Sequence, residues 1–297
     1  MIFQSCRHIN FIFDFKKCVQ ISLMRTYTHK KVDLPCIGLG CYKMEKHETE
    51  RSILTAVEAG YRFFDTAQSY ENEEDIGNAI KVAGLRRNEF FISTKLSTKH
   101  GYQETRDSLL KSLELLKVDY VDLYLIHSPS NGKILETWNA FQDLQTEGYT
   151  KYIGVSNFNI HHLEGLLAME NYIPDVNQIE YHPWHQHRSL LEYCNYKGIS
   201  IMGYCPLARM QLIPTSQDHI LSILALKYKK DISQILLRWS IQNNVMAIPK
   251  SVTATRIKEN IDLFDFRLSE HDMRHIDDLD CGHQIASINA INEPWTG

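Results

Sequence analysis

Polar side chains occur where short, strand-like runs of apolar residues end. Asp65, Lys95 and His127 each end or directly follow such a run, and Tyr70 lies in the loop after Asp65. Each residue alone has an ordinary explanation, as a helix cap, a solvated lysine or a histidine in a turn. Their recurrence at successive strand ends favours a shared function, because functional residues of α/β barrels gather where the strands end.

These four residue types together suit the reduction of a carbonyl group. The reaction needs a hydride at the carbon and a proton at the oxygen, and a tyrosine hydroxyl with a pKa of about 10 is a weak acid near neutrality. A nearby lysine ammonium stabilises the tyrosinate and lowers that pKa, and a buried lysine needs a carboxylate partner. A histidine can donate a hydrogen bond to the substrate oxygen and orient it. We therefore expect Tyr70 to be the proton donor, supported by Lys95, Asp65 and His127.

The elements that must position these residues alternate between strands and amphipathic helices. Helical periodicity is clear in residues 105–117, where Leu109, Leu113 and Leu116 fall on one apolar face. Gly60 and Gly84 follow two expected helices as C-terminal stop signals. The expected helices are 50–59, 72–82, 105–117 and 134–146, and the expected strands are 36–39, 61–65, 90–94, 123–126, 151–155, 175–179, 199–204 and 245–248.

This order amounts to about eight βα units with no linker and no shift in composition, which predicts one domain with a parallel sheet. Eight units favour closure into a (β/α)8 TIM barrel over residues 25–297. The alternative is an open doubly wound sheet, but no GxGxxG phosphate loop follows any strand. The nearest sequence, Gly38-Leu39-Gly40, has no third glycine. Polar residues also stand at the later strand ends, namely Ser156, Asn157, Gln178, Tyr204, Lys250 and Ser251.

Residues 1–24 do not fit the barrel pattern. Charged residues interrupt their apolar stretch, which excludes a signal-peptide core. A mitochondrial presequence would be rich in arginine and poor in acidic residues, whereas this stretch contains one Arg (Arg7) and one Asp (Asp14). We expect a disordered extension, or translation that starts at Met24.

Composition excludes several classes of function. The net charge is -4, and no basic block points to nucleic acid or to an anionic membrane. No apolar run approaches the roughly 18 residues that a membrane helix needs. The chain has seven cysteines with no CxxC pair, which argues against a disulfide framework and favours the cytoplasm.

In several segments that contain these residues, the chain closely resembles the aldo-keto reductase superfamily. Residues 60–73 (GYRFFDTAQSYENE) resemble its first signature, with Tyr70 at the proton-donor position. Residues 93–95 (STK) and 125–129 (LIHSP) resemble the segments with the catalytic lysine and histidine. Residues 154–158 (GVSNF) and 177–183 (NQIEYHP) resemble the nicotinamide-binding segments, and residues 248–251 (IPKS) resemble the segment that binds the adenosine 2′-phosphate. The resemblance extends from about residue 25 to residue 280.

The resemblance implies that NADPH lies across the barrel mouth, with Tyr204 stacked on one nicotinamide face. Lys250, Arg256 and Ser251 would bind the 2′-phosphate. The cofactor-binding residues that the resemblance implies are Ser156, Asn157, Gln178, Tyr204, Pro206, Leu207, Lys250, Ser251, Arg256, Glu259 and Asn260.

The expected substrate is a small-molecule aldehyde or ketone, bound by His127, with Tyr42 as an apolar wall and Trp184 as a weaker candidate. The chain departs from many relatives after the catalytic histidine, where Ser128 replaces an aromatic residue and predicts a roomier, more polar pocket. The stretch after Asp280, where relatives line the pocket, matches poorly. The resemblance suggests a monomer.

Two alternatives remain open at this point. A non-catalytic NADPH-binding regulatory subunit would share the fold, although it would not need the set of Asp65, Tyr70, Lys95 and His127. A metal protein could use the histidines at positions 182, 185 and 187, but their spacing matches no common zinc site, and we expect no metal.

Overall fold

A computed structural model describes residues 34–97, 101–130, 132–170, 173–212, 219–286 and 290–295. The extension expected at residues 1–24 lies outside the described residues. The strands are β1 (Leu39–Gly40), β2 (Phe63–Asp65), β3 (Phe91–Leu96), β4 (Val121–Ile126), β5 (Thr150–Ser156), β6 (Val176–Glu180), β7 (Ser200–Tyr204) and β8 (Val245–Ala247). The α-helices are α2 (Lys46–Ala59), α3 (Glu73–Ala83), α4 (Tyr102–Leu116), α5 (Ile134–Thr146), α6 (Ile160–Glu170), α7 (Arg188–Lys197), α8 (Ile220–Tyr228), α9 (Ile232–Gln242), α10 (Ala254–Ile261) and α11 (Glu270–Asp277).

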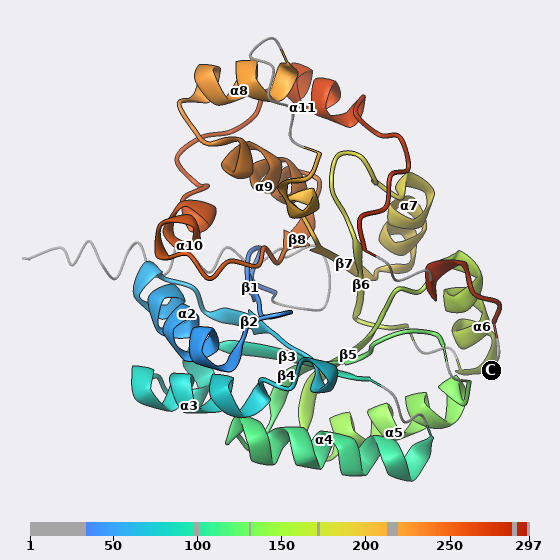
Figure 1. Ribbon diagram of the computed structural model, residues 1–297. Helices are drawn as coiled ribbons and strands as arrows, with labels where there is room; N and C mark the ends of the chain where they lie inside the picture. Colours follow the sequence, from blue (N-terminus) through green and yellow to red (C-terminus); the bar gives the residue numbers. More distant parts are fainter. Residues whose placement is uncertain are drawn as a thin grey trace, which may run out of the picture.

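The strands form one parallel sheet in chain order, from β1 to β8, with helices on its outer side (Figure 1). The sheet closes because the segment before β1 pairs with β8. Ile37 pairs in parallel with Ala247, the Gly38 amide donates to the Ala247 carbonyl at 2.9 Å, and the Ala247 amide donates to the Cys36 carbonyl at 3.1 Å. The predicted (β/α)8 barrel and single domain are therefore confirmed.

Close packing, rather than phosphate binding, explains why glycine occupies positions 38 and 40. A Cβ on Gly38 would lie 2.3 Å from Cδ1 of Phe63, and a Cβ on Gly40 would lie 2.8 Å from the carbonyl oxygen of Ile248. Both contacts are shorter than real Cβ contacts. The glycines therefore allow the first strand to approach its two neighbours, β2 and the chain after β8, where the barrel closes.

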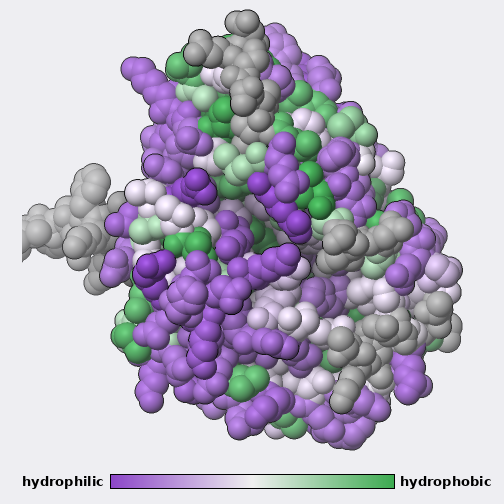
Figure 2. Space-filling view, viewed as in Figure 1, coloured by the Kyte–Doolittle hydropathy of each residue, from purple (hydrophilic) through white to green (hydrophobic). Residues whose placement is uncertain are grey.

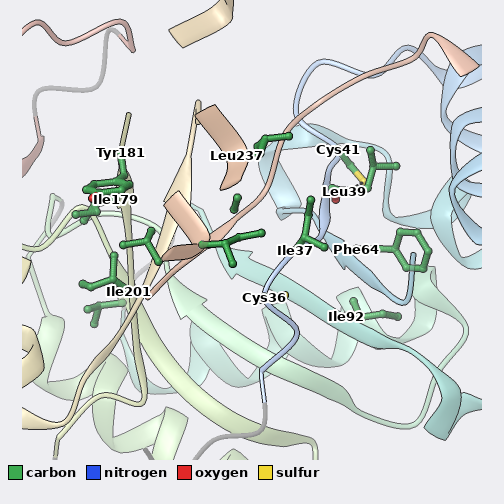
Figure 3. Close-up of a cluster of buried hydrophobic side chains, with 14 of the residues drawn as sticks. Cys36, Ile37, Leu39, Cys41, Phe64, Ile92, Ile179, Tyr181, Ile201 and Leu237 are labelled. Carbon is green, nitrogen blue, oxygen red and sulfur yellow. Dashed lines mark hydrogen bonds between the residues drawn. The ribbon is translucent and has the colours of Figure 1, made fainter. Parts of the chain in front are cut away.

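Alternation along the strands sorts the core into two layers. One layer lies inside the barrel, where Phe63, Phe91, Leu123 and Leu125 pack with other strand residues. The second layer lies between sheet and helices and holds their sequence neighbours, such as Phe64 and Ile92, which Figure 3 shows with Leu39, Ile37 and Cys41. This two-layer core fixes which side chains at the strand ends face the barrel interior.

The predicted helices and strands were found with small shifts at their ends. The helix predicted at 105–117 begins at Tyr102, after Gly101 in a backbone conformation with φ of 123°. The first strand, predicted at 36–39, is Leu39–Gly40, because Ile37 forms an isolated bridge with Ala247 and is not continuous with the strand. Gly60 and Gly84 end α2 and α3 in left-handed conformations, as predicted.

The hydropathy of the outer surface differs between the lower and the upper part of the molecule in Figure 2. Hydrophilic side chains cover most of the lower part, over α3, α4 and α5, whereas hydrophobic side chains gather near α8 and α11 at the top. On α8, Ile223 and Leu226 are exposed. Within the described ranges no helix combines the length and apolarity needed to cross a membrane.

Candidate active site

Lys95 lies at the centre of a buried polar cluster at the carboxyl ends of β2 and β3. Its ammonium donates to Oδ2 of Asp65 at 2.8 Å, to the carbonyl of Thr66 at 2.8 Å and to the hydroxyl of Tyr70 at 3.4 Å. The Lys95 side chain is 0% exposed. Such burial is tolerated because the ammonium has three partners, one of them a carboxylate.

The strands place these groups through their register and alternation. Asp65 ends β2 and pairs with Ser93 of β3, two residues before Lys95. The Ser93 hydroxyl and the Gln178 side-chain amide donate to Oδ1 of Asp65 at 2.6 and 2.8 Å. Both carboxylate oxygens of Asp65 are therefore bonded. Tyr70 arrives from the short helix η1 (Gln68–Tyr70), which follows β2 directly.

The local electrostatics keep the Tyr70 hydroxyl protonated. Burial raises the pKa of Tyr70 well above its ordinary value, and the negative charge of Asp65 adds to this effect. Burial lowers the pKa of Lys95, while Asp65 acts in the opposite direction. This direction is opposite to the lowering that the sequence predicted, because burial of the phenolate, with the nearby negative charge of Asp65, disfavours its ionisation.

His127 follows β4 and faces Tyr70. The two rings are 5.8 Å apart and nearly perpendicular. Burial, together with the positive charge of Lys95, lowers the pKa of His127 to about 3, so that the imidazole is neutral near pH 7. Its Nδ1 atom lies 3.3 Å from the hydroxyl of Ser97, and no described residue bonds its Nε2 atom.

The residues predicted to bind nicotinamide lie together after β5, β6 and β7. The Asn157 side-chain amide donates to the carbonyl of His127 at 3.0 Å, and the Tyr204 hydroxyl donates to Oδ1 of Asn157 at 2.9 Å. The Ser156 hydroxyl donates to the carbonyl of Gln178 at 2.9 Å. Through Asn157, these contacts join the predicted nicotinamide-binding residues to the loop that carries His127. The predicted cofactor residues and the predicted catalytic residues are therefore contiguous.

A second group lies after β8, at the start of α10. Lys250 and Arg256 are exposed, and neither forms an ion pair with any residue described in the structure. Ser251 is buried, and its hydroxyl accepts from the Thr253 amide at 3.2 Å. The first turn of α10 has no acidic residue, and the Thr253 side chain does not cap it. The helix N-terminus and the two cations all contribute positive charge to this region.

The remaining predicted residues differ in their distance from the cluster. The Tyr42 ring lies 5.0 Å from the Tyr70 ring and is 46% exposed. Trp184 is buried, and no hydrogen bond or ring contact joins it to the four clustered residues. After β7, Pro206 is buried and Leu207 is half-buried. On α10, Asn260 is buried and Glu259 is exposed.

Sequence reasoning missed several residues that support the cluster. Ser93 bonds Asp65, and its inward direction could have been inferred, because it lies two residues before Lys95 on the same strand. Ser97 continues that alternation and reaches His127. Asn72 accepts from the Thr66 hydroxyl at 2.7 Å and donates to the Cys41 carbonyl at 2.8 Å, contacts that the sequence does not reveal.

Among the three histidines considered as metal ligands, His182 pairs with a buried glutamate. His182 and Glu180, both buried, lie with Nε2 and Oε1 3.0 Å apart. The amides of Ile285 and Ala286 donate to the two carboxylate oxygens of Glu180 at 2.6 and 3.0 Å. Glu180 thus attaches the C-terminal segment to the end of β6.

Comparison with known proteins agrees with this geometry. A sequence profile of the Aldo/keto reductase family matches residues 36–280. The chain is 43% identical over 259 residues to glyoxal reductase of Bacillus subtilis (strain 168), covering 86% of this chain and 93% of that protein. It is 41% identical over 254 residues to methylglyoxal reductase of Escherichia coli (strain K12), covering 85% of this chain and 92% of that protein.

Solved structures give the same result. An aldo-keto reductase from a Medee basin deep-sea metagenome library superposes with a TM-score of 0.82 at 41% identity, covering 86% of this chain and 94% of the other. An aldo-keto reductase of Bombyx mori in complex with NADP gives a TM-score of 0.81 at 36% identity, covering 86% and 92%. Fold, site and sequence agree, and the chain is an oxidoreductase that belongs to the aldo/keto reductase family.

Proposed function

We propose that the chain is an NADPH-dependent reductase that converts small aldehydes and ketones to alcohols, with Tyr70 as the proton donor. The observation that carries the proposal is the position of Lys95, whose ammonium contacts both the Asp65 carboxylate and the Tyr70 hydroxyl inside a buried site. A non-catalytic cofactor-binding subunit would not require this costly buried pair.

Tyr70 suits the donor role in two ways. Its raised pKa keeps the proton on the hydroxyl until a stronger base, the developing alkoxide of a reduced carbonyl, is present. When the proton leaves, the Lys95 ammonium at 3.4 Å stabilises the tyrosinate that forms. Asp65 keeps the ammonium in place through its own hydrogen bonds.

His127 has a separate role in orienting the substrate. Its imidazole is neutral, because burial and Lys95 hold its pKa near 3. A neutral imidazole carries one N–H group, which can donate to the carbonyl oxygen without competing with Tyr70 as an acid. The carbonyl oxygen would then lie between the Tyr70 hydroxyl and the His127 ring.

The residues present fit a bound NADPH. Lys250 and Arg256 are two exposed cations that form no ion pair with any described residue. They lie at a helix start that the Thr253 side chain does not cap, and they suit a phosphate dianion. Asn157, Gln178 and Ser156 would hold the carboxamide, and the half-exposed ring of Tyr204 would support the nicotinamide. When bound, the cofactor supplies the hydride. Pro206, Leu207, Glu259 and Asn260 complete the proposed binding set.

For the substrate, the features of the site favour a short and polar carbonyl compound. Ser128 and Ser130, whose hydroxyls are 2.6 Å apart, lie directly after His127. Tyr42 would form the apolar wall, with Trp184 as the weaker candidate. Two similar proteins are named glyoxal reductase and methylglyoxal reductase. Short 2-oxoaldehydes are therefore the first class to test.

The test follows NADPH oxidation by absorbance with glyoxal, methylglyoxal, 2-ketoacids and aldoses, with NADH in parallel. We expect turnover with NADPH, and a loss of about 100- to 10,000-fold in kcat for Tyr70→Phe, the usual range for a lost general acid. NADPH affinity should persist in the variant. Turnover close to that of the parent would remove Tyr70 from the donor role, and NADPH binding without turnover on any carbonyl would favour the regulatory subunit. A monomeric state and a cytoplasmic location stay predictions.

A further inference from the structure

Ser97 lies between His127 and the loop that carries Tyr70. It is half-buried, directly after β3, and its hydroxyl oxygen is 3.3 Å from Nδ1 of His127. The same oxygen accepts a hydrogen bond from the Ser69 amide at 3.0 Å. Ser97 therefore joins the residue before Tyr70 to the imidazole, although its hydroxyl forms no hydrogen bond with the Tyr70 hydroxyl or with Lys95 Nζ.

The hydrogen-bond inventory favours one direction for the contact between Ser97 and His127. A serine hydroxyl has one hydrogen and two lone pairs, and the Ser69 amide occupies one lone pair. The hydrogen has two possible acceptors, His127 Nδ1 at 3.3 Å and the Lys95 carbonyl at 3.5 Å. The second distance lies further beyond the usual O–H···O range of about 2.5–3.0 Å, so the shorter contact favours donation of the hydrogen to His127 Nδ1. In that arrangement His127 Nδ1 is the acceptor.

We propose that Ser97 is a positioning residue that holds His127 in the tautomer with its hydrogen on Nε2. In this state the edge of the ring opposite Ser97 presents an N–H donor to the carbonyl oxygen of the substrate. Without the Ser97 hydroxyl, the hydrogen can move to Nδ1, and Nε2 becomes an acceptor that repels the carbonyl oxygen. This inference rests on the proposed function, since it assigns His127 a substrate to orient.

Gln68 fixes the position of Ser97. Its side-chain oxygen accepts from the Ser97 amide at 3.3 Å, and its side-chain nitrogen donates to the Ser108 carbonyl at 2.8 Å and to the Ser112 hydroxyl at 3.2 Å. Both serines belong to α4. The backbone of Ser97 is therefore held independently of its hydroxyl, so that removal of the hydroxyl should change the tautomer without moving the loop.

The first measurement is the tautomer of His127. In a 15N-labelled protein at pH 7, long-range 1H–15N correlations distinguish a protonated from an unprotonated ring nitrogen, and a His127→Gln sample assigns the signals. We expect Nε2 to carry the hydrogen in the parent, a substantial population of the Nδ1–H form in Ser97→Ala, and the parent pattern in Ser97→Thr, which keeps the hydroxyl. A hydrogen on Nδ1 in the parent, or an unchanged tautomer in Ser97→Ala, would overturn the proposal.

The second measurement is turnover. Ser97→Ala should lower kcat about five-fold, the factor that corresponds to one neutral hydrogen bond, with the NADPH Kd unchanged. Ser97→Thr should recover most of the loss. A loss of kcat without a change of tautomer would show a merely structural role for Ser97 and would also overturn the proposal. Absence of turnover in the parent itself would refute the proposed function, and the tautomer spectra would still decide the role of Ser97.

Discussion

At the scale of single residues, burial controls the chemistry of the site. Lys95 is fully buried, and its charge is tolerated because Asp65 lies 2.8 Å away and is itself held by Ser93 and Gln178. Removal of either charged partner would leave the other buried alone, which typically costs about 3–5 kcal/mol. The same burial raises the pKa of Tyr70 and lowers that of His127, so both stay uncharged near pH 7.

The charges at the start of α10 give a prediction about cofactor choice. Lys250 and Arg256 are exposed and free of ion pairs with described residues, and each would contribute a charge-assisted contact to a 2′-phosphate. Contacts of this kind contribute about 1.5–3 kcal/mol each. We therefore expect Lys250→Glu with Arg256→Glu to weaken NADPH binding by roughly 100-fold or more, while NADH binding changes little. Fluorescence titration would measure both.

Lys258 provides the matched control for this experiment. It is an exposed lysine on the same helix and has no proposed role in binding. Lys258→Glu alters the net charge of α10 but should leave the NADPH Kd within about two-fold of the parent value, since exposed charges are screened by salt. An unchanged NADPH Kd in the double variant, or an equal loss for NADH, would remove the two residues from phosphate recognition.

The sequence predicted which polar residues lie together better than it predicted their environment. Asp65, Tyr70, Lys95 and His127 are conspicuous because reactive residue types recur at strand ends. Their pKa values depend on burial and on distances that only the folded chain sets, and this is why the predicted direction for Tyr70 was wrong. Ser97 is conspicuous in neither type nor position, and its proposed role depends on a contact of 3.3 Å with His127.

At the scale of elements, alternation within strands explains why polar residues meet at one end of the barrel. On β3, Phe91, Ser93 and Lys95 face inward in succession, from the apolar interior to the polar mouth. The sequence predicts such alternation well, because side chains of successive strand residues point to opposite faces. Strand ends are less predictable, since they depend on pairing with neighbours, as at Ile37 and Leu39.

The C-terminal segment is an element that its own sequence did not predict. It matched the family poorly after Asp280, yet it is tied to the barrel at several points. The Trp184 carbonyl accepts from the Cys281 and His283 amides at 3.3 and 2.8 Å, and the Glu293 carbonyl bonds His162 of α6 at 2.7 Å. Figure 1 shows the dark red end of the chain beside α6. On the C-terminal segment the bonded groups are the backbone amides of Cys281 and His283 and the carbonyl of Glu293, which leave no sequence signature.

The contacts of Glu180 predict how firmly the C-terminal segment is held against the barrel. Its carboxylate accepts both the Ile285 and Ala286 amides, and Glu180→Gln would place an NH2 group against one of these donors. Hydrogen bonds to a charged group contribute about 1.5–3 kcal/mol each. We expect amide hydrogen exchange at these two positions to rise by about 10- to 100-fold, while exchange within β6 stays constant. Mass spectrometry of peptides or NMR would measure it.

An exposed glutamate on the next helix serves as the comparison. Glu192 lies on α7 and is exposed, so that Glu192→Gln makes the same chemical change without touching the C-terminal segment. Exchange at Ile285 and Ala286 should match the parent in this variant. If Glu180→Gln also leaves their exchange unaltered, the carboxylate does not hold the segment, and its attachment depends on the Trp184 carbonyl and the contacts at Glu293.

At the scale of the whole molecule, closure of the sheet brings strands far apart in sequence to one site. Asp65 of β2 and Gln178 of β6 are hydrogen-bonded across the barrel interior, 113 positions apart in the chain. The number of βα units predicted the barrel, because eight units with no phosphate loop favour closure. The contact itself could not be predicted, since it depends on barrel width and on the rotamers that the interior allows.

Buried or half-buried neutral histidines make the stability of the whole molecule sensitive to acid. The pKa of His127 is lowered from an ordinary 6.5 to about 3, and those of His162 and His187 to about 4, with burial as the main cause. Below pH 6.5 the unfolded chain binds protons that the folded chain does not, so the free energy of unfolding falls as pH falls. For His127 alone the loss at pH 5 is about 2 kcal/mol, since each pH interval of one unit contributes about 1.4 kcal/mol.

His127→Gln should therefore flatten the fall of Tm between pH 7 and pH 5, as measured by calorimetry, because glutamine does not titrate. This window lies above the usual carboxylate range. Glu73 also titrates differently in the folded and unfolded chains, but its raised pKa makes the free energy of unfolding rise as pH falls. Because Glu73 is present in both proteins, the difference in slope between variant and parent reports on His127 alone. His47→Gln, at an exposed position, should keep the slope of the parent. A parallel fall of Tm in His127→Gln and the parent would show that His127 accepts a proton as readily in the folded chain as in the unfolded one, and its proposed role as a neutral donor would then fail as well.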